Sequence, residues 1–241
     1  MRLHRFYIEQ KVGEQSEITI PSDELVHQIV NVFRLGKNDQ VILFDNSGFE
    51  FVTQIFSFSK KEITLSILSK VDKSPEVYGR PFVSLYMSLI KKNNLELAVE
   101  KVTEVGVVEI HPVVSERSEK KNLNFERLQK IAKEASEQCG RVTLPEVFHV
   151  TDLEVAVSQV VKQNDVCIVF HTGFDGAESD VIGKEVADTK AKVAVFVGPE
   201  GGWTDNEIEI FKKNNFQVRS LGRNVLRAET AAIVAVWSVA K

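Results

Sequence analysis

The residues best suited to chemistry lie near the carboxyl end of the chain. Residues 221–231 read Leu-Gly-Arg-Asn-Val-Leu-Arg-Ala-Glu-Thr-Ala and run into an apolar stretch with the composition of a buried helix. An amino-terminal helix cap by Glu229 and Thr230 would account for these two residues alone. It does not account for Arg223 and Arg227, because the amino terminus of a helix disfavours cations. The segment therefore indicates an anionic ligand or substrate.

A glycine-rich segment precedes it. Residues 198–202 read Gly-Pro-Glu-Gly-Gly and lie between the apolar run 192–197 and a capping-box pattern at 204–207. Glycine allows positive φ angles and close approach of the backbone to a ligand. The spacing matches neither a dinucleotide fingerprint nor a P-loop, which disfavours a pyrophosphate ligand. A ligand held by backbone N–H and C=O groups fits better, and a tight strand-to-helix turn without a ligand is the alternative.

A third short segment, His171-Thr172-Gly173, directly follows the apolar run 165–170. In open α/β sheets, ligands bind outside the carboxyl ends of the strands. Three loops of this chain occupy that position, at 171–173, 198–203 and 221–231. We therefore expect them to form one ligand site.

Other kinds of site are disfavoured by the spacing of the residues. The two cysteines, Cys139 and Cys167, can build neither a disulfide framework nor, with the scattered histidines, a zinc site. No Ser-His-Asp or Cys-His arrangement is apparent. We expect no metal.

Composition excludes other classes of protein. The 241 residues include 30 basic and 34 acidic ones, for a net charge of -4, so any nucleic-acid site must be a local patch. The first residues show no apolar run typical of a signal peptide. The longest apolar stretches fall far short of the roughly 20 residues that a membrane span needs. We expect a soluble, cytoplasmic protein that does not enter a membrane.

The elements that must position these residues fall into two groups. Up to about residue 72, short strands at 40–44, 49–56 and 62–68 with one helix between Pro21 and Gly36 indicate a small β-barrel-like module. In that helix, Leu25, Ile29, Val32 and Phe33 form one apolar stripe.

After a linker at 71–81, strands alternate with helices, which predicts an α/β domain with a largely parallel sheet. A second capping box is expected at 151–154. The expected strands are 82–90, 109–114, 165–170, 192–197 and 216–221, and the expected helices are 94–105, 124–139, one after 151, 204–214 and 228–240.

Together these motifs carry a resemblance. The segment 198–202, followed by Leu-Gly-x-x-Val-Leu-Arg-x-Glu-Thr-Ala at 221–231, resembles the signature of the 16S rRNA (uracil-1498-N3) methyltransferase family, of the knotted SPOUT class. The chain departs from that pattern at Glu119, Leu128 and Ala228, and Ala228 removes a threonine that the family often has at its cofactor loop. Further segments agree in order and spacing: 4–6, 27–36, 100–107 with Pro112, and 134–141 with Pro145.

The resemblance implies a fold and an assembly. An N-terminal PUA-like RNA-binding β-barrel would span residues 1–72, and a C-terminal SPOUT α/β trefoil-knot domain with a parallel sheet would span 73–241. Members of the family act as homodimers with S-adenosyl-L-methionine bound in the knot, near the subunit interface. The residues implied to bind this cofactor are His171, Thr172, Gly173, Gly198, Pro199, Glu200, Gly201, Gly202, Leu221, Gly222, Val225, Leu226 and Thr230.

The resemblance also implies a reaction, the transfer of a methyl group to N3 of one uridine of 16S rRNA in the small ribosomal subunit. We expect Arg227 to stabilise negative charge on the uracil carbonyls, and Glu229 to orient Arg227 or to act as the base. RNA-backbone contacts are expected from Arg5, Arg34, Arg117 and Arg141. The alternatives are methylation of another rRNA or tRNA site, and a non-catalytic RNA-binding assembly factor.

Overall fold

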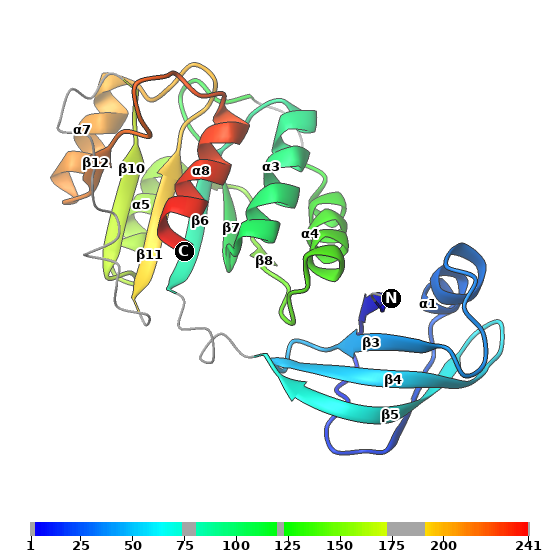
Figure 1. Cartoon of the computed structure of the whole chain (residues 1–241). Coiled ribbons are helices and arrows are strands. Elements are labelled where there is room, and N and C mark those ends of the chain that lie inside the picture. Colours follow the sequence, from blue (N-terminus) through cyan, green and yellow to red (C-terminus); the bar gives the residue numbers. More distant parts are fainter. Residues whose placement is uncertain (1–2, 74–80, 120–122, 173–190, 241) are drawn as a thin grey trace. The chain divides into compact units, whose positions relative to one another are not determined.

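The chain folds into two compact units in a computed structural model that describes residues 3–73, 81–119, 123–172 and 191–240 (Figure 1). The first unit consists of Met1–Tyr78 and Ser136–Leu144, and the second of Gly79–Ala135 and Pro145–Lys241. From the sequence, residues 136–144 are expected in the second domain, whereas the structure groups them with the first unit.

The first unit is built on a five-stranded sheet with the order β1-β3-β4-β5-β2. β1 pairs with β3 in parallel, and the other neighbours are antiparallel. Alternate residues of the strands, such as Val41, Leu43, Phe51 and Ile55, point into a buried core. The strands are β1 (Arg5–Tyr7), β2 (Glu17–Ile20), β3 (Gln40–Phe44), β4 (Phe49–Phe58) and β5 (Ile63–Asp72).

The helical segment of this unit differs from the prediction. A short helix α1 (Asp23–Val26) runs directly into a π-helical segment η1 (His27–Val32). The N–H of Phe33 donates to the carbonyl of Gln28 at 3.0 Å, five residues back, which widens the turn. Val32 consequently leaves the apolar stripe and is 59% exposed, so the predicted burial of this residue is wrong.

Three hydrogen bonds tie residues 136–144 into the first unit. The Glu137 carboxylate accepts from the N–H of Tyr7 at 3.0 Å. Arg5 Nη2 donates to the carbonyl of Arg141 at 2.8 Å, and the N–H of Leu144 donates to Asn46 Oδ1 at 2.7 Å. These partners are far apart in the sequence, which is why no local pattern predicted the grouping.

The second unit contains a seven-stranded sheet in which every pairing is parallel. The strand order is β12-β10-β11-β6-β7-β8, and the short β9 also pairs with β7. The strands are β6 (Phe82–Ser88), β7 (Glu109–Val114), β8 (Glu146–Val147), β9 (Thr151–Asp152), β10 (Val166–Phe170), β11 (Lys192–Val197) and β12 (Gln217–Arg219).

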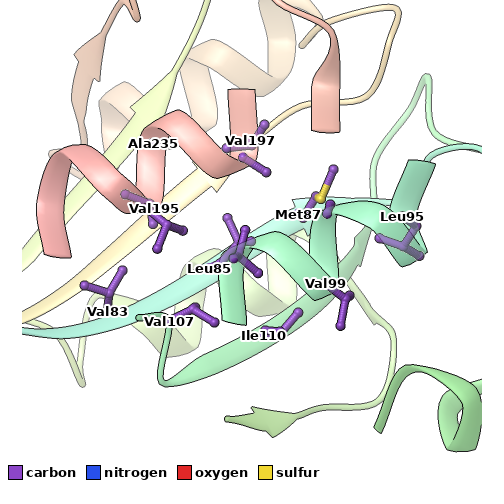
Figure 2. Packing of buried hydrophobic residues seen from close by; sticks show 14 of the residues in the cluster. Val83, Leu85, Met87, Leu95, Val99, Val107, Ile110, Val195, Val197 and Ala235 are labelled. Atoms are coloured by element: carbon purple, nitrogen blue, oxygen red, sulfur yellow. The ribbon is translucent and has the colours of Figure 1, made fainter. Parts of the chain in front are cut away.

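Helices cover both faces of this sheet, as a parallel sheet requires. Alternate residues of β6 and β11, including Val83, Leu85 and Val195, pack under one group of helices, as Figure 2 shows. Tyr86 and Phe196 point to the opposite face and stack with their ring centroids 4.5 Å apart. The first face is covered by α3 (Lys92–Val105), α4 (Phe125–Cys139) and α8 (Ala228–Ala240), and the second by α5 (Leu153–Val160) and α7 (Asp205–Lys213).

Most elements of the second unit follow the sequence prediction. β7, β11 and α8 have the predicted bounds, and Gly106 closes α3 with a φ of 114°. The capping box predicted at 151–154 is wrong, because Thr151 and Asp152 form β9 and Asp152 makes no side-chain cap hydrogen bond. No helix within the described ranges is long and apolar enough to cross a bilayer.

Candidate cofactor and substrate site

The three loops predicted to form a site meet around one cavity at the carboxyl ends of β10, β11 and β12. They lie at the end of the sheet where α8 begins (Figure 1). The cavity is open to solvent, and about 650 Å³ of space lies between and in front of its lining atoms. Its lining residues are Phe170, His171, Thr172, Val197, Gly198, Pro199, Glu200, Gly202, Trp203, Ser220, Leu221, Gly222, Asn224, Val225, Leu226, Ala228 and Ala231.

Three of the thirteen residues predicted to bind a cofactor do not line the cavity in the described structure. Gly201 lies against Arg117, and Thr230 is exposed on α8. Gly173 lies outside the described residues. The lining residues that the prediction missed come from two strand ends, from the loops after β11 and β12 and from α8, and Trp203 is the largest of them.

The indole of Trp203 packs closely against Gly198 of the glycine loop, residues 198–202. A Cβ added at Gly198 would lie 3.1 Å from the indole ring, closer than an ordinary contact, so a side chain at this position would press on the indole. Trp203 is buried, and its Nε1 donates to the carbonyl of Phe170 at 3.1 Å. This hydrogen bond joins the end of β10 to the loop after β11, and it thereby fixes the distance between two walls of the cavity.

The buried carboxylate of Glu207 anchors the carboxyl-terminal end of the same loop through hydrogen bonds. Glu207 is 5% exposed and forms the predicted capping box with Thr204, whose N–H donates to Glu207 Oε2 at 2.8 Å. Glu207 Oε1 accepts from the N–H of Glu116 at 2.9 Å. The Thr204 hydroxyl in turn donates to Glu116 Oε2 at 3.1 Å. One carboxylate therefore joins the turn after β7 to the start of α7, where the glycine loop ends.

Glu207→Gln should lower the free energy of unfolding by about 1–3 kcal/mol, because one of the two backbone N–H groups that the carboxylate accepts from then faces an amide NH₂ instead of an acceptor. We expect ligand affinity at the cavity to fall with it, since the glycine loop loses its anchor. Glu209→Gln is the matched control. Glu209 lies on the same helix with an exposed side chain and pairs only with Lys212 among the bonds of the described residues. Equal denaturant midpoints for the two variants would contradict the anchoring role.

The four arginines predicted to contact RNA have different surroundings. Arg5 is buried and pairs with Glu50. Arg117 Nη1 donates to the carbonyl of Gly201 at 2.9 Å, and Arg141 Nε donates to the carbonyl of Thr143 at 3.1 Å. Arg34 is exposed, with a φ of 57° that is uncommon for a residue other than glycine. Their contacts with RNA stay a prediction.

Arg227 and Glu229 flank the cavity at the start of α8. The Arg227 side chain is exposed, whereas Glu229 is 6% exposed. No hydrogen bond joins the two side chains in the described structure. Glu229 Oε2 is buried and finds no hydrogen-bond partner among the described residues. A buried, unsatisfied carboxylate oxygen is costly, which is consistent with a partner that arrives with a ligand.

His171 has similar features. Its Nδ1 is buried without a hydrogen-bond partner in the described part of the chain. Burial is the main cause that lowers the pKa of His171 below its usual value, partly opposed by the charge of Asp205. The imidazole is therefore neutral at pH 7 and can offer Nδ1 to a ligand in the cavity. No group of three or more His, Cys, Asp or Glu side chains within the described ranges is arranged to hold a metal ion.

Two protein families match separate parts of the chain. Residues 80–240 match a family described as an RNA methyltransferase domain. Residues 21–68 match a family described as an RNA methyltransferase PUA domain. The first match covers the whole of the cavity described above.

Individual relatives are similar over nearly the full length. The chain is 31% identical to the ribosomal RNA small subunit methyltransferase E of Rickettsia conorii, covering 99% of this chain and 96% of that protein. Among solved structures, the ribosomal RNA small subunit methyltransferase E of Neisseria gonorrhoeae bound to S-adenosyl methionine has a TM-score of 0.84 and 26% identity, covering 98% and 95% of the two chains. A Legionella pneumophila protein in complex with the bound cofactor SAM also has a TM-score of 0.84, with 27% identity and coverage of 98% and 96%.

Proposed function

This chain belongs to the RNA methyltransferase family, and on that premise we propose that it transfers a methyl group from S-adenosylmethionine to N3 of one uridine of 16S rRNA. The observation that carries the proposal is the single cavity formed by the three strand-end loops. The chain is similar over nearly its full length to a small-subunit rRNA methyltransferase whose structure holds S-adenosyl methionine. The resemblance described above supports the uridine at position 1498 as the target.

The cavity suits this cofactor. Its walls combine apolar side chains with the backbone of glycine-containing loops, and it has no Gly-Lys-Ser/Thr phosphate loop. Two buried polar atoms without partners in the described structure, His171 Nδ1 and Glu229 Oε2, lie in or beside these loops. The residues that would hold the cofactor are those of the three loops that line the cavity, at 171–172, 198–200, 202, 221–222 and 224–226. Bound there, S-adenosylmethionine supplies an electrophilic methyl group.

The chain's own residues must then position the base and move one proton. The proton on N3 has to leave as the new N–C bond forms, and the uracil carbonyls gain negative charge. An exposed guanidinium at Arg227 can stabilise that charge. Of the two roles considered for Glu229, acceptance of the proton is favoured, because Oε2 has no hydrogen-bond partner among the described residues and no bond to Arg227 is present.

N3 lies on the Watson–Crick edge of uracil, so the base must be unpaired or flipped to react. The reaction is an in-line displacement, which depends on alignment more than on covalent help from the protein. The rigid fastening of the glycine loop by Trp203 and Glu207 supplies such alignment. A target in the small ribosomal subunit implies a cytoplasmic enzyme.

The test is methyl transfer from labelled S-adenosylmethionine into small ribosomal subunits that lack the modification, followed by nucleoside analysis. N3-methyluridine at the expected position supports the donor, the reaction and the target together. Tight cofactor binding without label in this RNA would point to another rRNA or tRNA site. Neither label nor cofactor binding would favour the non-catalytic assembly factor.

We also propose that the protein acts as a homodimer through α8. A helix that is apolar on all sides is normally covered on all sides. Trp237 of α8 is nevertheless 54% exposed, and Ile233 and Val234 are only half-buried. We expect light scattering of the wild-type protein to give twice the 27.1 kDa chain mass, and Trp237→Glu to give the mass of one chain. A wild-type mass of one chain at micromolar concentration would reject the dimer.

A further inference from the structure

Strand β4 of the first unit contains a bulge that exposes an aromatic side chain. Ile55 pairs with Leu65 and Ser57 pairs with Thr64, so Phe56 has no partner on β5. Bulges of this kind redirect a side chain and are common beside functional sites. Phe56 is 52% exposed, and Phe58, two residues further along the same strand, is 42% exposed. Phe58 pairs with the fully buried Ile63 and therefore shares the core-facing side of the sheet, whereas Phe56, at the bulge, offers a flat apolar face that the core does not use.

A lysine already lies over the first of these rings. Lys37 Nζ is 5.4 Å from the centroid of the Phe56 ring. Two backbone hydrogen bonds of 2.9 Å hold the loop of Lys37 against β4, from the N–H of Asn38 to the carbonyl of Ile55 and from the N–H of Ile55 to the carbonyl of Asp39. The fold therefore holds the backbone of the Lys37 loop beside the strand that carries the ring.

More positive charge lies near Phe56 in the sequence. The hairpin turn after Phe58 carries Lys60 and Lys61, both exposed, and is closed by the N–H of Ser59 donating to the carbonyl of Glu62 at 2.9 Å. Arg34, three residues before Lys37, is exposed as well. Residues 34–39 and 56–62 together contain four cationic side chains and only two carboxylates, those of Asp39 and Glu62. This local excess of positive charge occurs in a chain whose net charge is negative.

We propose that this surface binds unpaired nucleotides of the RNA substrate, with a base stacked on Phe56 and the neighbouring phosphates near the cations. The surface consists of Arg34, Lys37, Phe56, Lys60 and Lys61 and is called the Phe56 platform below. Exposed aromatic rings flanked by cations are the chemistry by which proteins hold single-stranded nucleic acid. Paired bases do not offer their faces, so a duplex is not the expected ligand. The inference rests on the proposed function, because it deepens what the enzyme recognises.

The strand that faces the bulge supplies a matched control. Val52 pairs with Ser69 and Thr53 pairs with Ile67, which leaves Leu68 of β5 as a second bulged residue. Leu68 is 49% exposed, nearly as much as Phe56, but it is neither aromatic nor flanked by a cation in the described contacts. Leu68→Ala therefore removes the same kind of exposed apolar group without removing a stacking face.

The experiment measures the affinity of the full-length protein for a fluorescein-labelled, single-stranded 12-nucleotide oligouridine at two salt concentrations. Phe56→Ala should weaken binding by about 5- to 100-fold, as loss of one stacked base would. Phe56→Trp should bind as tightly as the wild type, and Leu68→Ala should be unchanged. The double variant Lys60→Ala/Lys61→Ala should flatten the salt dependence by about 0.7 for each phosphate that the protein no longer neutralises.

Equal affinities of Phe56→Ala and wild type would overturn the proposal, and so would equal losses in Phe56→Ala and Leu68→Ala, or a failure of Phe56→Trp to restore binding. Thermal unfolding of each variant shows that the fold is intact.

Methyl transfer by the wild type separates the two proposals. Transfer that is unaffected by Phe56→Ala at limiting substrate, with unchanged affinity, rejects the platform alone. RNA binding through Phe56 without any transfer rejects the proposed reaction alone.

Discussion

Replacing Arg227 with Ala should lower methyl transfer to the small subunit by about 100- to 1,000-fold, the usual cost of removing one group that stabilises a developing oxyanion. Cofactor affinity should stay within a few-fold of the wild type, because Arg227 does not line the cavity. Its guanidinium is exposed beside the start of α8, where a substrate base can reach it. Single-turnover transfer and calorimetric titration with S-adenosylmethionine measure the two quantities separately.

Arg223→Ala is the matched control for this prediction. Arg223 belongs to the same loop, is also exposed and carries the same charge. A loss of transfer that is specific to Arg227 identifies a local role, whereas equal losses would indicate general attraction of RNA by the loop. If Arg227→Ala instead abolished cofactor binding, its assignment to the reacting base would be wrong.

Trp203→Ala should lower the free energy of unfolding by about 3–5 kcal/mol, as large-to-small changes at buried aromatic residues do. The indole is 4% exposed and packs edge-on against Phe211 with ring centroids 5.0 Å apart. It also fills the space beneath Gly198, so its removal should loosen the cavity wall. Chemical denaturation followed by circular dichroism measures the first effect, and cofactor titration measures the second.

Trp203→Phe separates packing from the hydrogen bond. The ring is kept, but the carbonyl of Phe170 loses the donor Nε1. We expect a smaller loss of about 1–3 kcal/mol, the cost of a buried polar group left without its partner. If Trp203→Ala changed stability by less than Trp203→Phe, the indole would not be the support that its burial indicates.

The sequence allowed the meeting of the three loops to be predicted because its determinants are local. Apolar runs predict buried strands, and the segments 171–173 and 198–202 each directly follow such a run, while the charged segment 221–231 follows the expected strand 216–221. Parallel strands place their carboxyl ends at one edge of the sheet, so short loops after them must meet. The cavity is formed by these three loops, with the start of α8.

The contributions of single side chains could not be predicted in the same way. Trp203 follows the glycine loop in the sequence, but only the packing of α7 against β10 and β11 turns its indole under Gly198. Glu207 was expected to cap its own helix, and the structure adds the N–H of Glu116, 91 residues away, as a second donor. Gly201, predicted to bind the cofactor, lies instead against Arg117.

The order of the elements, the parallel sheet and the loops that carry the site follow from the amino-acid sequence alone, because periodicity, glycine and caps act over a few residues. Which arginines form hydrogen bonds or ion pairs within the protein depends, in contrast, on the three-dimensional fold. Arg5 is buried against Glu50 and Arg117 holds Gly201, whereas Arg34 is exposed in the same loop region as Lys37. A guanidinium pairs with whatever acceptor the fold brings within hydrogen-bond distance, and these acceptors come from residues 45 and 84 positions away.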